Sequence, residues 1–458
     1  MRNPMFVYDE EMTDLIVDYC RWRLSLDPVP LDFGGARESL DTLLDDVVGP
    51  EGHDPRQVME VFSQLAEAVV SCDSPRFLSF IPAAPTKAAL LFDMVVSCSS
   101  LQGTSWLEAA GAVAAENQAL AVLASLAGLP GGAGGCFVSG GSIANLSALV
   151  VARDTAPLRR DGRRGGRIAI SEDAHSSVAA ALHVIGVEPF VVPVDDHRLT
   201  GRALEAALSR DPAAGDGVIG VVATAGTTNA GIVDDLAGVA AVAARRGLWL
   251  HVDAAYGGAA LLSHSTRDRF SGIELADSLV VDPHKWLFAP FDCAALLYRE
   301  PRLAKAVHTQ DAGYLEILHR PTGRDVIDED GPWNPSDYAI HLTRRARGLP
   351  LWFSLAVNGI DAYRDAVDAV LGIARRATEL IADAPHLELV REPELSVVLF
   401  RRTGWGGADY EAWSARLLAD QTGFVTPTVW EGEPIARFCF LHPDTTEAMV
   451  ADILATMA

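Results

Sequence analysis

The stretch LVVDPHKWLFAPFDCAAL, residues 279–296, places His284 and Lys285 inside an apolar run. An isolated ammonium is costly to bury, so a lysine in such a run must find a partner, lose its proton or react. A desolvated lysine has a lowered pKa and acts as an amine nucleophile toward carbonyls. The competing interpretation is a surface lysine whose stem packs on Trp286. The stretch alone favours that interpretation, because most lysines are exposed.

Nearly continuous apolar runs of the same kind precede this stretch. They are GVIGVVATAG (217–226), LWLHVDAAY (248–256) and DSLVVDPH (277–284), with the β-rich runs RIAIS (167–171) and VEPFVVPV (187–194) upstream. Alanine-rich helical stretches alternate with these runs. Strands of this composition are covered on both faces, which predicts an α/β fold with a mostly parallel sheet. Functional residues are then expected in the loops at the carboxyl ends of the strands.

The C-terminal part of the chain follows a different pattern. Residues 349–384 predict a long helix with a break near Asn358 and Gly359. The elements expected after it are a strand (395–401), a helix (409–422), a strand pair (424–441) and a terminal helix. This order predicts a small α+β domain.

We therefore expect three parts: an N-terminal helical segment (1–75), a large α/β domain (76–348) and a small α+β domain (349–458). Residues 9–25 show the apolar spacing of a helix within the first part. The polar stretch HRPTGRDVIDEDGPWNPSD (319–337) is loop-like by its glycine, proline and aspartate content. Long loops of this kind are often lids, and many are simply connections.

Composition excludes several classes of function. The 458 residues carry a formal net charge of -24, and an acidic surface repels nucleic acid and anionic membranes. The sequence contains no apolar run of about 18 residues, the length that would span a membrane. Residues 109–129 come closest, but polar side chains from Glu116 to Gln118 interrupt them. They are typical of a helix buried in a core or at a subunit interface.

The cysteines and histidines do not indicate a metal or disulfide framework. The six cysteines are scattered without a CxxC pair, and the twelve histidines form no HExxH motif. The first residues lack the apolar region of a signal peptide. We expect a cytoplasmic protein with reduced thiols and no metal.

Polar groups stand where the predicted strands end. Asp253 ends an apolar strand, where a carboxylate could pair with a pyridinium nitrogen or simply cap a helix. Gly140, Gly141 and Ser142 lead into a helix, and backbone N–H groups at a helix N-terminus can hold a phosphate. The glycines do not fit G-x-G-x-x-G and no Walker lysine is present, which disfavours a nucleotide site.

Three further groups follow the same arrangement. His175 comes after a strand and could stack on a ring or move a proton, although a structural histidine is more common. Thr227 and Thr228 end another strand with small hydroxyl donors. Tyr314 precedes the polar loop and could donate a proton from a mobile segment, or could simply pack. Read singly, each group favours the plain structural interpretation.

Read together, the set resembles a known family. The motifs are SPRFLSFIP, SGGSIANL, SEDAHSS, AGTT, LHVDAAYGG, ADSLVVDPHKW, FDCAALLY, RRARGLPLWFSL and IARFCFLHP. Over residues 70–458 the chain is similar to the group II pyridoxal-phosphate-dependent amino-acid decarboxylases, which include the aromatic-amino-acid, histidine and glutamate decarboxylases. The resemblance implies fold type I with a seven-stranded sheet, pyridoxal phosphate as cofactor, and release of CO2 from an L-amino acid.

The resemblance also implies roles for individual residues. Lys285 matches the lysine that forms the Schiff base with the cofactor, His175 the histidine stacked on its ring, and Asp253 the partner of the ring nitrogen. Ala255 would lie on the opposite ring face, and Thr228 near the ring. Positions on the phosphate side are matched by Gly140, Gly141, Ser142 and His284. Tyr314 matches the loop tyrosine that protonates the quinonoid carbon after CO2 leaves.

Active sites in this family lie between two subunits, so the resemblance implies a homodimer. The substrate side would include Phe80, Ile81, Pro82, Gln102 and Thr104, together with Arg437, which matches an arginine that contacts a substrate carboxylate in the glutamate branch. Gln102 and Thr104 are polar where the aromatic branch has apolar or aromatic residues. A smaller or more polar amino acid is thereby favoured, while Phe80 and Ile81 keep part of an apolar wall.

Three further functions are compatible with the sequence. A decarboxylation-coupled oxidative deaminase, forming an aldehyde, ammonia and peroxide on the same scaffold, often has a changed loop tyrosine or ring-stacking histidine. Both residues are retained here. A non-catalytic homologue that binds the cofactor is the second function, and a dinucleotide oxidoreductase is the third.

Overall fold

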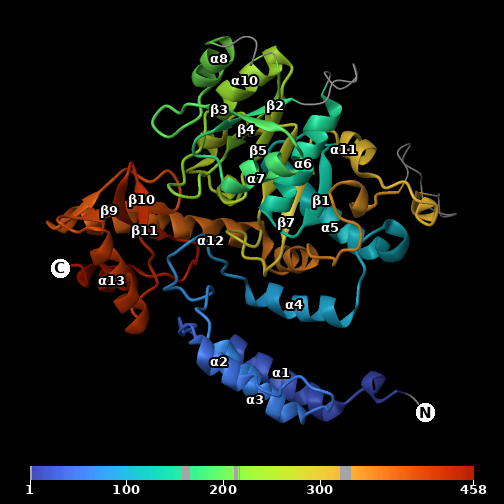
Figure 1. Ribbon diagram of the computed structural model, residues 1–458, viewed down its shortest axis with the longest axis vertical. Coiled ribbons are helices and arrows are strands. Elements are labelled where there is room, and N and C mark those ends of the chain that lie inside the picture. The colour runs from blue at the N-terminus through green and yellow to red at the C-terminus, as the bar shows by residue number, and fades with distance from the viewer. Residues whose placement is uncertain (1–2, 157–165, 211–214, 216, 320–331) are drawn as a thin grey trace.

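The computed structural model describes residues 3–156, 166–210, 215, 217–319 and 332–458. Its centre is a seven-stranded sheet with the order β1-β7-β6-β5-β4-β2-β3 (Figure 1). The strands are β1 (Gly134–Val138), β2 (Arg167–Ser171), β3 (Glu188–Val192), β4 (Val218–Thr224), β5 (Trp249–Asp253), β6 (Ser278–Val281) and β7 (Ala294–Tyr298). Neighbours from β3 to β6 pair in parallel, whereas β7 is antiparallel to both β6 and β1. The mostly parallel sheet is therefore confirmed.

Helices cover both faces of this sheet, which explains the continuous apolar runs. On one face, Val280 and Leu296 pack in a cluster with Ala144 of α6 (Gly141–Thr155). On the other face, Leu279 belongs to a larger cluster with Val239 of α10 (Leu236–Arg246). The remaining helices of this region are α4 (Lys87–Cys98), α5 (Trp106–Leu126), α7 (Ser176–Val184), α8 (Gly201–Arg210) and α11 (Pro301–His308).

Helix α5 is tied to the start of α12 (Leu349–Asp383) by a buried ion pair. Both guanidinium NH groups of Arg344 lie 2.7 Å from the carboxylate of Glu116, and the backbone N–H of Gly348 donates to the same carboxylate at 2.8 Å. Among the described residues, α5 is the one helix whose length and composition would allow it to cross a membrane. Its inner face is buried in protein around Glu116, as predicted for residues 109–129.

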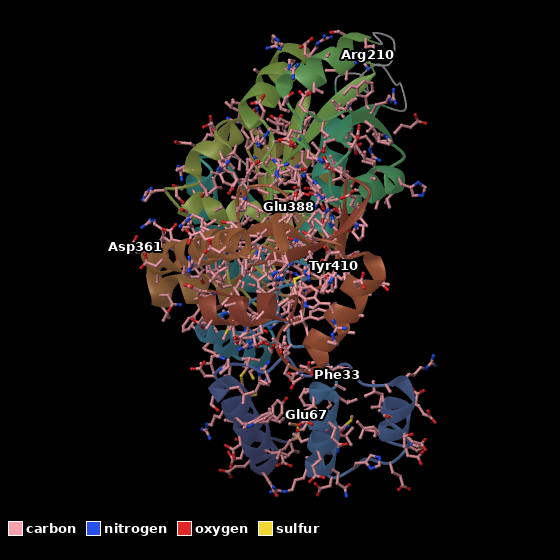
Figure 2. All side chains as sticks on the ribbon, turned by 90° about the vertical axis from the view of Figure 1, so that its left-hand side faces the viewer. Phe33, Glu67, Arg210, Asp361, Glu388 and Tyr410 are labelled. Atoms are coloured by element: carbon pink, nitrogen blue, oxygen red, sulfur yellow. The ribbon has the colours of Figure 1, made fainter. Side chains whose placement is uncertain are left out.

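The first three α-helices of the described chain are α1 (Glu10–Ser25), α2 (Arg37–Leu43) and α3 (Pro55–Glu67). They lie apart from the rest of the chain, at the bottom of Figures 1 and 2. All their residues are described, and none is buried. Large apolar side chains such as Trp22 and Phe62 are therefore half exposed.

The C-terminal part begins with α12 and contains a second, antiparallel sheet of order β10-β11-β9-β8. Gly359 breaks α12 with a φ of 80°, at the predicted position. The other elements are β8 (Leu387–Leu389), β9 (Val397–Arg402), α13 (Gly407–Ala419), β10 (Thr428–Trp430), β11 (Glu433–Cys439) and α14 (Glu447–Ala455). Short 3-10 helices are η1 (Pro4–Phe6), η3 (Gly257–Leu262), η4 (Arg267–Phe270), η5 (Ile273–Leu275), η6 (Glu316–His319) and η7 (Pro335–Asp337).

Candidate active site

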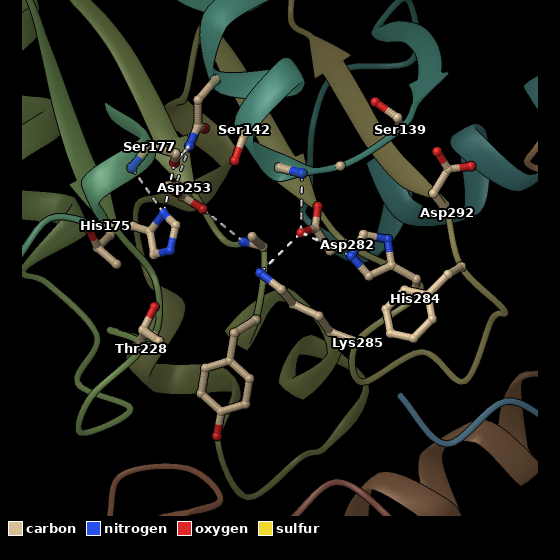
Figure 3. A pocket seen from close by; sticks show the side chains of 18 residues that line it. Ser139, Ser142, His175, Ser177, Thr228, Asp253, Asp282, His284, Lys285 and Asp292 are labelled. Carbon is tan, nitrogen blue, oxygen red and sulfur yellow. Dashed lines mark hydrogen bonds and ion pairs between the residues drawn. The ribbon is translucent and has the colours of Figure 1, made fainter. Parts of the chain in front are cut away.

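A cavity of about 350 Å³ lies where β4, β5 and β6 end and α6 and α7 begin (Figure 3). This is the edge of the sheet at which functional residues were expected. The predicted cofactor residues all line it: Gly140, Gly141, Ser142, His175, Thr228, Asp253, Ala255, His284 and Lys285. Residues separated by more than a hundred positions in the sequence thus meet in one site.

Lys285 points into the cavity and is held by a carboxylate. Its Nζ lies 3.0 Å from Oδ2 of Asp282, and 23% of its side chain is exposed. Burial by itself lowers the pKa of Lys285, but the charges of Asp282 and Asp253 outweigh it and raise the pKa above its ordinary value. The lowered pKa expected from the apolar run is therefore wrong, because the run itself contains the acidic residue Asp282.

Asp253 is held by two donors at the end of β5. The side-chain amide of Asn145 donates to Oδ2 at 2.9 Å, and the backbone N–H of Ala255 donates to Oδ1 at 3.1 Å. Asn145 in turn lies 2.9 Å from Nε2 of His251, which is fully buried. Burial lowers the pKa of His251 to about 4, so this imidazole is neutral at neutral pH. Asp253 consequently presents a carboxyl group fixed in orientation by two donors to the cavity.

His175 caps α7 with its own ring. Nδ1 accepts the backbone N–H of Ser177 at 3.2 Å and lies 2.8 Å from the Ser177 hydroxyl. Asn145 donates to that hydroxyl at 3.1 Å, which leaves the hydroxyl proton for Nδ1. The Nε2 side of the ring remains directed toward the cavity (Figure 3).

The start of α6 is suited to an anion. Gly140, the residue before the helix, supplies no side-chain cap, and Gly140, Gly141 and Ser142 all line the cavity at this helix N-terminus. The N–H of Gly141 donates to Oδ2 of Asp282 at 3.2 Å. A Cβ at Gly141 would meet that carboxylate oxygen at 2.9 Å and Ala255 at 3.3 Å, so glycine is required for the close approach.

His284 completes this side of the cavity. Its Nδ1 accepts the N–H of Cys293 at 3.1 Å, which places the proton of the neutral ring on Nε2. Burial lowers its pKa, and nearby Lys285 acts in the same direction, although Asp282 opposes it. His284 thus offers a neutral Nε2–H donor at this side of the cavity.

Other predicted residues do not line this cavity in the described chain. They are Phe80, Ile81, Pro82, Gln102, Thr104, Tyr314 and Arg437. Phe80 and Tyr314 are 62% and 73% exposed. Gln102 donates to Glu108 at 2.7 Å, and the Thr104 hydroxyl is buried without a partner among the described residues.

Arg437 and Thr227 stand just behind the cavity. The guanidinium of Arg437 donates to the backbone carbonyl of Thr228 at 2.6 Å and to that of Asn229 at 3.1 Å, which fixes the loop after β4. The hydroxyl of Thr227 accepts the N–H of Ile232 at 3.1 Å within the same loop. Residues 320–331 of the predicted lid lie outside the described residues.

Sequence reasoning missed four residues that organise the site: Asn145, Ser177, His251 and Asp282. Asn145 stands one helical turn after Gly141, so it shares the cavity face of α6, a spacing that could have revealed it. Asp282 ends β6 as Asp253 ends the neighbouring β5, and strand ends were already the expected place. His251 carried no signal, because a histidine inside a strand is usually structural.

The residues present fit pyridoxal phosphate. An amine, a carboxylate fixed by donors and the start of α6 surround one cavity. Two buried oxygens that line it, Oδ1 of Asp282 and the Thr224 hydroxyl, have no partner among the described residues. Both are placed to meet a polar ligand.

Comparison with known proteins identifies the class. A family model described as the pyridoxal-dependent decarboxylase conserved domain matches residues 39–403, and the chain belongs to that family. It is therefore a carboxy-lyase that decarboxylates an amino acid with pyridoxal phosphate as cofactor, as the resemblance implied.

Individual relatives cover nearly the whole chain. The aromatic-L-amino-acid decarboxylase of Bacillus atrophaeus is 30% identical over 456 residues, which are 97% of this chain and 92% of the relative. The L-2,4-diaminobutyrate decarboxylase of Rhizobium meliloti (strain 1021) is 33% identical over 375 residues, 80% of this chain and 74% of the relative. The crystal structure of Oryza sativa TDC with PLP and tryptamine superposes with a TM-score of 0.85 at 26% identity, covering 98% and 96% of the two chains. The fold is thus that of the type I pyridoxal enzymes.

Proposed function

We propose that this enzyme converts an L-amino acid into the corresponding amine, with Lys285 as the residue that holds the cofactor covalently. The observation that carries the proposal is the convergence of Lys285, Asp253 and the start of α6 in one cavity. Bound pyridoxal phosphate supplies an electron sink for the pair left at Cα when CO2 departs. Asp253, fixed in orientation by Asn145 and Ala255, would pair with the ring nitrogen and favour a proton on it.

The other cavity residues would orient the cofactor and the substrate. His175, with its ring direction set by Ser177, covers one face of the ring, and Ala255 lies on the other. Gly140, Gly141, Ser142 and His284 hold the phosphate. Thr228 lies near the ring, with its backbone fixed by Arg437.

Tyr314 would return the proton to Cα, acting in the cavity of a second chain. Its exposure outside its own cavity supports this role, because a loop that served its own site would lie against it. The half-exposed apolar side chains of α1–α3 also support a homodimer, since a second chain would cover them. The exposed Phe80 and Gln102 would reach the partner's cavity in the same way, and Ile81, Pro82 and Thr104 stand beside them in the sequence.

The substrate side chain is proposed to be smaller or more polar than an aromatic ring. Support comes from Gln102 and from the buried, unpartnered hydroxyl of Thr104, because a site built with such groups favours a ligand that pairs with them. The relatives named above act on aromatic L-amino acids and on L-2,4-diaminobutyrate, so both chemistries belong in the substrate panel.

We also propose the division into parts 1–75, 76–348 and 349–458, and a cytoplasmic location. All six cysteines are free, which fits a reducing compartment.

The absorbance spectrum of the purified protein tests the central proposal. A band near about 420 nm, lost on borohydride reduction and absent in Lys285→Ala, is expected for a lysine-bound cofactor. An amino-acid panel should then give CO2 and amine in equal amounts. Stoichiometric peroxide would instead establish the oxidative deaminase. Failure to form the band with added pyridoxal phosphate would refute the assignment of Lys285.

A further inference from the structure

Asp282 lies at the start of α6, where the proposed function places the cofactor's phosphate. Its Oδ2 accepts the N–H of Gly141 at 3.2 Å, the first residue of α6. The side chain is 2% exposed, and its second oxygen, Oδ1, is buried without a partner among the described residues. A helix N-terminus attracts any anion, so this carboxylate and a phosphate compete for the same donors.

Two negative groups cannot share this position without compensation. Of the described residues that line the cavity, Lys285 is the only lysine or arginine, at 3.0 Å from Asp282. The proposed function commits that amine to the cofactor. The α6 side offers backbone N–H groups and the Ser142 hydroxyl, but no charged side chain.

The other ionisable groups around Asp282 do not replace the lost ammonium. His284 is neutral with its proton on Nε2, which lies 3.7 Å from Oδ2 of Asp282. Asp253, at the end of β5, is a second carboxylate. Asp292, in the loop before β7, pairs with Arg347. A like charge disfavours the ionised form of a carboxyl group, so the arriving phosphate favours protonation of Asp282.

We propose that Asp282 links cofactor binding to proton uptake, an inference that rests on the proposed placement of the phosphate at the start of α6. Asp282 takes one proton from solvent as the phosphate binds. The new O–H of Oδ1 donates to a phosphate oxygen, while Oδ2 still accepts the N–H of Gly141. Apart from the bond between Lys285 and the cofactor, which the proposed function already includes, no covalent bond of the chain forms or breaks. Affinity for pyridoxal phosphate therefore falls as pH rises, because the proton becomes harder to supply.

The test is the dissociation constant of pyridoxal phosphate from the apoenzyme between about pH 6.5 and about pH 9. The cofactor's own groups titrate in every variant, so the informative quantity is the difference between curves. The affinity of the wild type for pyridoxal phosphate should fall up to about tenfold more per pH unit than that of Asp282→Asn. At high pH the variant should therefore bind the cofactor more tightly than the wild type does. Calorimetry in buffers of different ionisation enthalpy should show about one more proton taken up by the wild type.

Two controls keep the result specific. Asp292→Asn removes a carboxylate from the same cavity and should retain the wild-type slope, since Asp292 is already paired with Arg347. Pyridoxal, which lacks the phosphate, should bind the wild type without the additional pH dependence, and this comparison needs no variant.

The inference would be overturned if affinity fell with pH equally in the wild type and Asp282→Asn, or if both took up the same number of protons. The 420 nm band of the wild type would still be normal in that case. Absence of that band in the wild type would refute the proposed function, and the inference with it. The two failures are therefore distinguishable.

Discussion

Nε2 of His251 lies 2.9 Å from the side-chain oxygen of Asn145, whose nitrogen lies 2.9 Å from Asp253. On the far side, Ser278 receives the indole N–H of Trp249 at 2.9 Å and lies 2.8 Å from Nδ1 of His251. The Asn145 oxygen can only accept, so Nε2 of the neutral His251 ring donates to it and Nδ1 accepts the Ser278 hydroxyl. The donor direction is therefore the same at every link from Trp249 to Asp253, and the chain ends by fixing the orientation of the carboxyl group proposed to face the ring nitrogen.

Asn145→Leu should interrupt this chain at nearly constant volume. Asp253 and His251 would each lose a partner, and loss of such an outer partner typically costs about 10- to 100-fold in activity. We expect kcat to fall by about that factor and the cofactor's absorbance to titrate at a different pH. An unchanged titration with kcat within about twofold of the wild type would contradict a positioning role.

Tyr314→Phe should keep the cofactor band but lower amine formation by about 100- to 10,000-fold, because a positioned proton donor is lost. If each cavity uses the partner's tyrosine, mixed dimers of Tyr314→Phe and Lys285→Ala contain one intact site. Denaturing and refolding the two variants together should then restore about a quarter of wild-type activity. No restoration would place Tyr314 in its own chain's site, or remove it from the reaction.

Glu116→Ala should destabilise the protein by about 3–5 kcal/mol, because it leaves the buried charge of Arg344 uncompensated. The free energy of unfolding by urea is the measurement. The double variant Glu116→Leu with Arg344→Met should lose less free energy of unfolding than Glu116→Ala, since no charge remains buried. Glu379→Ala breaks an exposed pair with Arg376 and should change stability by less than about 1 kcal/mol.

His341 should make stability fall on acidification. Burial lowers its pKa to about 4, while its hydrogen bond to the carbonyl of Pro335 opposes the shift. The unfolded chain takes up this proton below about pH 6.5, whereas the folded chain does not until about pH 4, so unfolding becomes easier across that window.

His341→Gln keeps a donor for Pro335 but does not titrate. Between about pH 7.5 and pH 5, it should lose about 2 kcal/mol less stability than the wild type. His53→Gln changes an exposed histidine and should follow the wild-type curve. Equal losses of stability in the wild type and both variants would show that His341 does not contribute to the fall on acidification.

The large sheet was predictable because strands covered on both faces must be apolar throughout. The direction of β7 was not predicted, since an apolar run carries no sign of direction. The connection from Val281 to Ala294 contains no helical crossover, and β7 returns antiparallel to β6. β8 spans only Leu387–Leu389 and offers too few residues for a pattern.

The meeting of Lys285 and Asp253 was predictable because parallel strands end at one edge. The partners of these residues were not. Asp282 acts through a 3.2 Å contact with Gly141, which is distant in sequence, and His251 acts through Asn145. The proposed place of Tyr314 in the site of a second chain could not be predicted either, because one sequence does not contain the position of a partner.

The three N-terminal helices bury none of their residues within one chain, although they carry Trp22 and Phe62. Such a segment gains little free energy until another surface covers it. In the proposed homodimer, ordering α1–α3 and joining two chains become a single equilibrium. Dilution then acts as a denaturant: the melting temperature of this enzyme should rise with its own concentration.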